Sequence, residues 1–335
     1  MNPFDPATLP LVFAGLLGLS ILIYVVLDGF DLGVGILLPQ ARGDEERDTM
    51  IASIGPFWDA NETWLVLAIG ILLVAFPAAH GEILGALYLP VAVMLIGLIL
   101  RGVAFEFRVK APAGQKALWD RCFFGGSLAA ALAQGFMLGL YVMGLDWTPW
   151  NVAFAALTAV SLAVAYSFIG ASWLIVKTDG LLQDAAITWA RRALAGVIVG
   201  LAAISAATPL VSARIFDKWF AWPEVLLLSP LPVASAALVA LIRVWLGRLA
   251  DDPHRQAWLP FAAATVLFAL GFVGMAYSFY PYIVPDRITI AEAASAPESL
   301  AIILWGVIFV LPAIIAYTAL SYVIFRGKAK RLSYD

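Results

Sequence analysis

The chain is poor in charged residues, in cysteine and in histidine. Only 13% of its 335 residues are charged, against about a quarter in soluble globular domains. The single cysteine, Cys122, excludes an internal disulfide and any zinc site built from several cysteines of one chain. The two histidines, His80 and His254, lie between apolar runs, so they cannot face each other inside a helical bundle as axial haem ligands do. We therefore expect no metal or haem to be ligated by this chain alone.

Apolar residues, by contrast, are abundant, and 63% of the chain is hydrophobic. Apolar runs of about 20 residues, enough to cross the core of a bilayer, repeat along the whole length. We expect an all-α membrane protein with a single integral membrane domain over residues 1–335, whose first apolar run is a span and not a cleaved signal. About nine transmembrane helices are expected, near residues 10–38, 50–76, 82–107, 121–144, 151–176, 187–210, 223–247, 258–280 and 299–325.

Lysine and arginine predict the orientation of these spans. Sixteen of the 20 basic residues fall after the first, third, fifth and seventh spans or in the C-terminal tail, which includes Lys330 and Arg331. Only Arg214, Lys218 and Arg287 fall on the opposite side. This asymmetry predicts a periplasmic N-terminus and a cytoplasmic C-terminus, which requires an odd number of spans, as nine is.

The most informative residues are ionisable groups inside three expected spans, because such groups are costly in a membrane and often mark proton pathways. They are Asp28 and Asp31 in the first span, Asp59 and Glu62 in the second, and Arg101 and Glu106 in the third. A rise of about 1.5 Å per residue predicts depths from roughly 3 Å for Glu106 to roughly 20 Å for Glu62. Carboxylates spaced in this way suit a conduit that carries protons from the cytoplasmic side towards mid-membrane.

A structural alternative stands beside the conduit. Arg101 could neutralise Asp28, Asp31 or Asp59 in an ion pair that locks three helices together. One arginine cannot pair with four acids, so some carboxyls must be protonated, bridged by water or paired to another chain. Near the inner surface, Glu106 and Arg108 could both be ordinary solvated helix ends.

Three stretches of the chain resemble the motifs of a known family. Residues 28–35 (DGFDLGVG), 55–64 (GPFWDANETW) and 101–108 (RGVAFEFR) are similar, in order and in spacing, to the signature of subunit II of cytochrome bd-type quinol oxidases. The length and the nine-span layout agree over the whole chain. Glu62 differs from the residue of better-known members and Phe57 replaces a histidine of some members, and these departures lean towards the cyanide-insensitive branch.

The resemblance implies a fold, partners and cofactors. Subunit II of this family consists of two four-helix bundles and one peripheral helix, which here would be residues 10–144, 151–280 and 299–325. It supports the assembly of a larger subunit I, which holds haems b558, b595 and d, and the heterodimer oxidises ubiquinol and reduces oxygen to water. Small single-span accessory subunits and a ubiquinone bound in subunit II occur in this family. The implied location is the bacterial inner membrane, among lipids and without a nucleic-acid partner.

The resemblance also implies roles for individual residues. The residues that match the family's hydrophilic path for cytoplasmic protons are Asp28, Asp31, Asp59, Arg101 and Glu106. Glu62 lies among them in the second motif, and Trp58 accompanies Asp59 near the subunit interface and its haem.

Two other functions compete with this interpretation. A proton-coupled secondary transporter often carries broken helices and matching groups in both halves of its sequence, whereas the buried charges here are confined to the first three spans. A purely structural membrane scaffold would make the acids dispensable.

Overall fold

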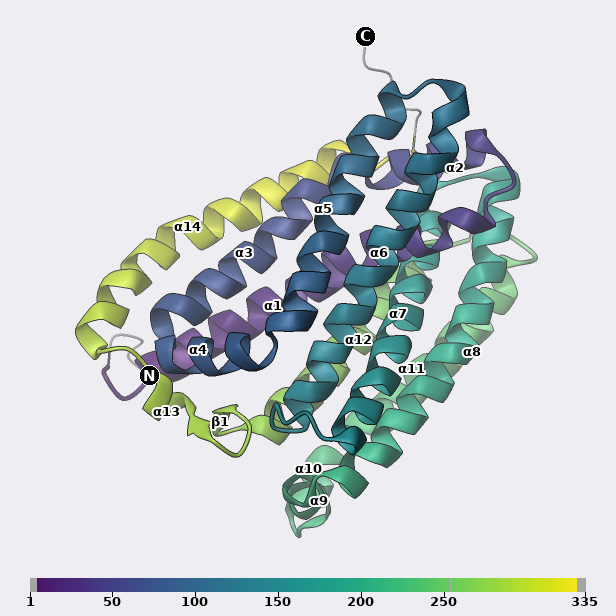
Figure 1. Cartoon of the computed structure of the whole chain (residues 1–335). Coiled ribbons are helices and arrows are strands. Elements are labelled where there is room, and N and C mark those ends of the chain that lie inside the picture. Colours follow the sequence, from purple (N-terminus) through teal and green to yellow (C-terminus); the bar gives the residue numbers. More distant parts are fainter. Residues whose placement is uncertain (1–4, 254, 330–335) are drawn as a thin grey trace.

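Long helices form nearly all of the protein in a computed structural model that describes residues 5–253 and 255–329 (Figure 1). The long helices are α1 (Leu9–Leu37), α3 (Trp58–Ala75), α5 (Tyr88–Lys110), α6 (Ala113–Val142), α7 (Pro149–Lys177), α8 (Gly180–Val211), α11 (Pro230–Leu249), α12 (Leu259–Phe279) and α14 (Pro297–Ile324). Within the described ranges, nine spans are long and apolar enough to cross a membrane, which confirms the expected all-helical membrane protein. Residues 1–4, His254, Lys330 and Arg331 lie outside the described residues.

Short elements connect these helices at the two ends of the molecule. They are η1 (Leu38–Gln40), α2 (Asp44–Ile54), α4 (Pro77–Ala86), α9 (Ala213–Phe220), α10 (Glu224–Leu228), β1 (Tyr282–Val284), β2 (Ile288–Thr289) and α13 (Ile290–Ala293). The two strands form a small antiparallel hairpin between α12 and α14.

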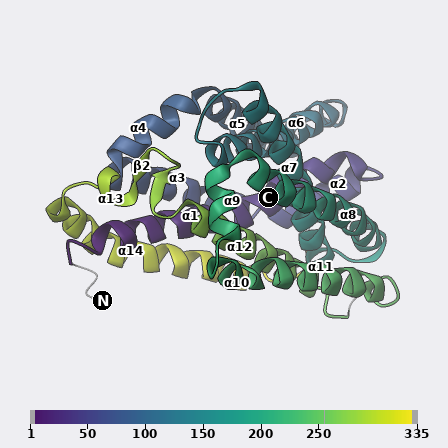
Figure 2. The ribbon, with the colours of Figure 1, turned by 90° about the horizontal axis from the view of Figure 1, so that it is seen from below.

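Helix α1 runs through the middle of the molecule and contacts α3, α6 and α7 (Figures 1 and 2). Helix α14 lies along the outer edge beside α3, while α8 and α11 lie on the opposite side (Figure 1). Most residues of α14 are exposed, and only Leu300 and Leu304 are buried. The division into two four-helix bundles and a peripheral helix stays a prediction, with α14 in the position expected of the peripheral helix.

The prediction of one continuous second span over residues 50–76 is wrong for its first part. The chain is not one helix there, because α2 ends at Ile54 and α3 begins only at Trp58. Pro56 has no backbone N–H to continue the helical hydrogen bonds, and its ring would clash with the preceding turn. Asp59 therefore lies in the first turn of α3, and a depth counted along a continuous helix does not hold for it or for Glu62.

Other boundaries differ by up to two turns. The expected third span, residues 82–107, begins only at Tyr88, because the separate helix α4 precedes it. The fourth and sixth spans begin earlier than expected, at Ala113 and Gly180. In both cases the helix continues past polar and charged residues beyond the apolar run, so hydropathy alone underestimates its length.

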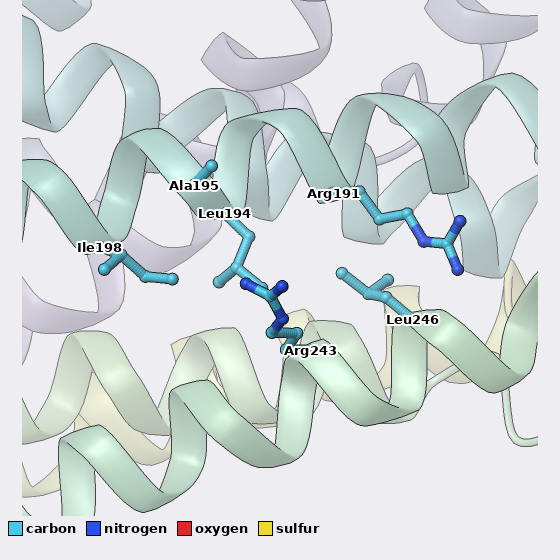
Figure 3. Close-up of a pocket in the computed structure, with 6 residues that line it drawn as sticks. All are labelled: Arg191, Leu194, Ala195, Ile198, Arg243 and Leu246. Carbon is cyan, nitrogen blue, oxygen red and sulfur yellow. The ribbon is translucent and has the colours of Figure 1, made fainter.

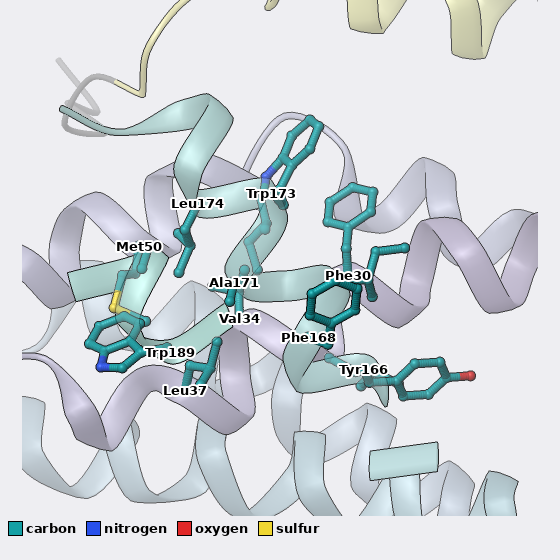
Figure 4. Packing of buried hydrophobic residues seen from close by; sticks show 14 of the residues in the cluster. Phe30, Val34, Leu37, Met50, Tyr166, Phe168, Ala171, Trp173, Leu174 and Trp189 are labelled. Carbon is teal, nitrogen blue, oxygen red and sulfur yellow. The ribbon is translucent and has the colours of Figure 1, made fainter. Parts of the chain in front are cut away.

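Glycines allow α1 and α7 to pack backbone against backbone. A Cβ atom at Gly33 would stand only 1.8 Å from the carbonyl oxygen of Tyr166, and one at Gly170 would meet the backbone of Gly33. Such close approach between membrane helices maximises van der Waals contact where no hydrophobic driving force operates between them. Next to this contact, Phe30 stacks on Trp173 with ring centroids 4.4 Å apart, inside the large apolar cluster of Figure 4.

Candidate functional site

Arg101 lies at the centre of a buried cluster of charges formed by α1, α3 and α5. Its Nη2 atom is 2.7 Å from Oδ1 of Asp28, and the same nitrogen donates to Oε1 of Glu62. The side chains of Arg101 and Asp28 are almost fully buried, whereas 27% of the Glu62 side chain is exposed. A Cβ at Gly126 of α6 would be 2.8 Å from the Arg101 backbone nitrogen, so a close helix contact fixes the backbone of Arg101. Three helices are thus joined through one guanidinium.

Asp31 occupies a neighbouring position with a partner of its own. It lies three residues after Asp28, on the same face of α1, and is fully buried. The Asn61 amide nitrogen of α3 donates to Asp31 Oδ2 at 2.8 Å. The Tyr322 hydroxyl of α14 donates in turn to the Asn61 side-chain oxygen at 3.2 Å. A chain of hydrogen bonds therefore links the acid of α1 to α14.

The cluster contains more negative than positive groups. Asp28, Asp31 and Glu62 surround one arginine, so full ionisation would leave two negative charges in excess. Asp28 Oδ2 and Asp31 Oδ1 are buried and have no hydrogen-bond partner in the described residues. Buried polar atoms in proteins are almost always satisfied by protein groups or water, and a carboxyl can also carry a proton. The arrangement is suited to holding water and exchangeable protons beside a fixed cation.

A second polar network begins at Tyr24, one helical turn before Asp28 in α1. Gln134 of α6 donates to the Tyr24 hydroxyl at 2.7 Å, and the Tyr166 hydroxyl of α7 donates to the Gln134 side-chain oxygen at 2.7 Å. Tyr24 precedes Asp28 by four residues and so lies on the same face of α1. These three side chains extend the polar region from the charged cluster towards the interior of the helix bundle.

Asp59, Trp58 and Glu106 lie outside the buried cluster. Asp59 is exposed in the first turn of α3, where a carboxylate is stabilised by the helix dipole. Trp58 is half-buried and packs on Phe105 of α5, with ring centroids 5.2 Å apart. Glu106 is exposed and lies 3.9 Å from Lys110 one turn away. Of the six residues expected to line a proton path, four come together and two lie on the outer face of α3 and α5.

Arg108 is buried, so the expectation that it is an ordinary solvated helix end is wrong. Its side chain is 2% exposed and donates to Asp120 of α6 and to Asp48 of α2. Lys116 lies 3.8 Å from Asp48 and joins the same network. This network fastens α2 and α6 to the end of α5. Glu106, two residues earlier, is exposed in the isolated chain.

Sequence reasoning missed the uncharged members of the site. Tyr24, Gln134, Tyr166 and Tyr322 carry no formal charge and occur in apolar runs, where a tyrosine is usually a packing residue. The available signal was spacing, because Tyr24 lies one helical turn from Asp28. A glutamine near the middle of a span is a second signal, since a buried amide needs hydrogen-bond partners. The pairing of Gln134 with two tyrosines required the helix arrangement.

No group of three or more histidine, cysteine, aspartate or glutamate side chains that could hold a metal ion occurs in the part of the chain that the structure describes. The charged cluster contains an arginine at its centre, which disfavours a cation there. The carboxyl groups of this cluster are of a kind that can bind and release protons.

Known proteins resemble this chain along nearly its whole length. The family described as cytochrome bd terminal oxidase subunit II matches residues 9–325. Cytochrome bd ubiquinol oxidase subunit 2 of Bacillus subtilis (strain 168) is 29% identical over 330 residues, which cover 93% of each protein. Cytochrome bd-I ubiquinol oxidase subunit 2 of Escherichia coli (strain K12) is 27% identical over 351 residues, covering 92% of this chain and 91% of that protein.

A solved structure shares the fold. A chain in the structure of the bd oxidase from Geobacillus thermodenitrificans superposes with a TM-score of 0.76, over 96% of this chain and 100% of that chain. The sequence identity is 17%, so this likeness bears on the fold alone.

Proposed function

This chain belongs to the cytochrome bd terminal oxidase subunit II family, and on that premise we propose that it is the non-haem subunit of a complex that oxidises ubiquinol and reduces oxygen to water. The relatives in Bacillus subtilis and Escherichia coli are named as subunits of ubiquinol oxidases. A larger partner, subunit I, supplies haems b558, b595 and d in this proposal, and this chain supports its assembly. The shortage of histidine in this chain is in keeping with that division.

The contribution of this chain to the reaction is a path for protons, and the buried cluster at Arg101 carries this part of the proposal. Oxygen reduction to water consumes protons, which must reach the haem site from the aqueous phase. Asp28, Asp31 and Glu62 surround one cation, and two buried carboxylate oxygens there have no protein partner in the described chain. The arginine keeps the group of acids from being uniformly negative, while the surplus carboxyls remain free to accept and release protons.

The exposed acids indicate where the protons would leave the chain. Asp59 and Glu106 lie on the outer surface of α3 and α5, next to exposed apolar residues such as Val66 and Val103. Acids on a lipid-facing surface would be costly. Subunit I covering this surface would enclose them, and Glu62, which is partly exposed there, would link the buried cluster to the interface. In this proposal the α2 end of the molecule lies on the cytoplasmic side of a bacterial inner membrane, which the asymmetry of basic residues supports.

Conservative substitutions in the intact complex test the proton path. Glu62→Gln and Asp31→Asn remove a titratable group with little change in shape, and Asp184→Asn, an exposed acid of α8, is the matched control. We expect ubiquinol-dependent oxygen consumption to fall by about 10²-fold or more in the first two variants, the order found when a positioned proton-transfer group is removed. Haem content and subunit ratio should stay at the level of the control.

Two outcomes would count against the proposal in different ways. Normal oxygen consumption in both variants would exclude a proton path through this cluster. Loss of haem from a complex whose two subunits are still expressed would show instead that the cluster serves assembly.

A further inference from the structure

A groove lies between α8 and α11 (Figure 3), and α8 is on the opposite side of the molecule from α3 (Figure 1). Its volume is about 340 Å³, within the range of small-molecule sites. Arg191 and Arg243, one from each helix, place their side chains between the two helices. The rest of the lining is apolar and consists of Leu194, Ala195, Ile198 and Leu246.

Neither guanidinium group forms an ion pair with a carboxylate of residues 5–253 or 255–329. Arg191 donates to the carbonyl oxygen of Gly247 at 3.3 Å, which is a neutral acceptor. Arg243 forms no ion pair and no side-chain hydrogen bond with any other residue that the structure describes. A pair of like charges facing one groove is unfavourable unless an anion lies between them.

The position of Arg243 strengthens this argument. It lies six residues before the end of α11, which corresponds to about 9 Å along the helix axis. Its neighbours Leu241 and Val244 are more than half exposed, as is Val199 of α8 across the groove. These apolar side chains face outward where lipid would surround the protein, so a cation is held at the edge of the hydrocarbon region. Such a charge is costly without a counter-ion or access to the headgroup layer.

We propose that this groove binds an anionic phospholipid, with its phosphate between Arg191 and Arg243 and its acyl chains along the apolar lining. Basic grooves between membrane helices commonly receive acidic headgroups, and arginine forks match phosphate oxygens in pairs. A free phosphate would satisfy the charges but leave Leu194, Ile198 and Leu246 without a partner. The charges of Arg191 and Arg243, which no acid of the described chain neutralises, favour an acidic headgroup over a zwitterionic one.

The binding of a lipid here does not depend on the oxidase activity proposed above. Helix α8 lies on the opposite side of the molecule from α3 and α14 (Figure 1), so a lipid in the groove leaves the surface proposed for subunit I free. The lipid would join α8 to α11, which contact each other much less closely than α7 and α8 do.

The test compares lipid binding by the purified intact complex and by its variants. The complex, in detergent, is titrated with phosphatidylglycerol, phosphatidylcholine or inorganic phosphate, and bound lipid is counted by native mass spectrometry. The test variant is R191Q/R243Q, and the matched control is R192Q/R248Q, which removes two arginines from the same helices outside the lining of the groove. We expect phosphatidylglycerol to bind about 30-fold more weakly to the test variant, about five-fold for each arginine.

Each other outcome has a defined meaning. Equally weakened lipid binding in the control variant would show that the lipid is held by non-specific attraction to a basic surface and not by this groove. Unchanged binding in R191Q/R243Q, or phosphatidylcholine binding as tightly as phosphatidylglycerol, would overturn the proposal. Inorganic phosphate displacing the lipid at equal concentration would make the groove a general anion site. The variant R191K/R243K keeps both charges and should retain binding, which separates loss of the site from loss of folding.

Discussion

Replacement of Arg101 by glutamine tests whether one guanidinium holds three helices together. The substitution removes the cation that pairs with Asp28 and Glu62 while leaving both carboxylates in place. Removing one partner of a buried ion pair typically costs about 3–5 kcal/mol, because the other charge stays buried without compensation. With an unfolding entropy of about 2.1 cal/mol/K per residue, this cost lowers the midpoint of thermal unfolding by about 4–7 °C for a chain of this length.

The assay is thermal unfolding of the purified complex at one fixed scan rate, since unfolding of such assemblies is a rate process. Asp28→Asn should lower the midpoint less than Arg101→Gln, because Arg101 still pairs with Glu62 in that variant. Arg192→Gln removes an exposed arginine of α8 and should leave the midpoint within about 1 °C, as surface substitutions usually cost under about 0.5 kcal/mol. A midpoint for Arg101→Gln equal to that of Arg192→Gln would refute the reasoning, and so would a larger loss in Asp28→Asn.

Three further predictions concern packing, the hydrogen bond to α14 and the hairpin. Gly33→Ala should destabilise the folded protein by about 1–3 kcal/mol or more, since the added Cβ would meet the Tyr166 carbonyl oxygen at 1.8 Å. Gly15→Ala is the control: its added Cβ has nothing within 4 Å, so its unfolding midpoint in the same thermal assay should be unchanged or slightly raised. Tyr322→Phe removes the donor to Asn61 and should cost about 0.5–1.5 kcal/mol by the same measurement, and an unchanged midpoint would mean that this hydrogen bond is not formed. The Thr289 backbone N–H and hydroxyl donate to the Glu292 carboxylate and hold its pKa below the ordinary 4.5. Hydrogen-exchange protection of the Thr289 amide should therefore be constant at neutral pH and be lost as the pH falls through the lowered pKa. Glu292→Gln should remove that pH dependence, and its persistence would contradict the assignment.

The spans were predictable from sequence because length and hydropathy determine which segments can cross a bilayer. The break at Gly55 and Pro56 is absent from the predicted span because the apolar residues at the end of α2 continue the apolar run of α3, although Pro56 is itself a helix-breaking signal in the sequence. Among the charged residues, the burial of Asp28 and Asp31 could be predicted, because both lie within the long apolar run that forms α1. The exposure of Asp59 did not follow, because it depends on where α3 begins and which face of α3 meets α5.

The two interpretations of Arg101 that the sequence left open are not exclusive once its contacts are known. The ion pairs to Asp28 and Glu62 join α1, α3 and α5, as a structural role requires. The same arginine cannot neutralise all three nearby acids, and the remaining partner of Asp31 is the neutral amide of Asn61. A purely architectural site would be more stable with two acids fewer, since unpaired buried charges destabilise a protein. The surplus acids are therefore the feature that a structural role does not explain, and the proposed transfer of protons to a partner subunit would account for them.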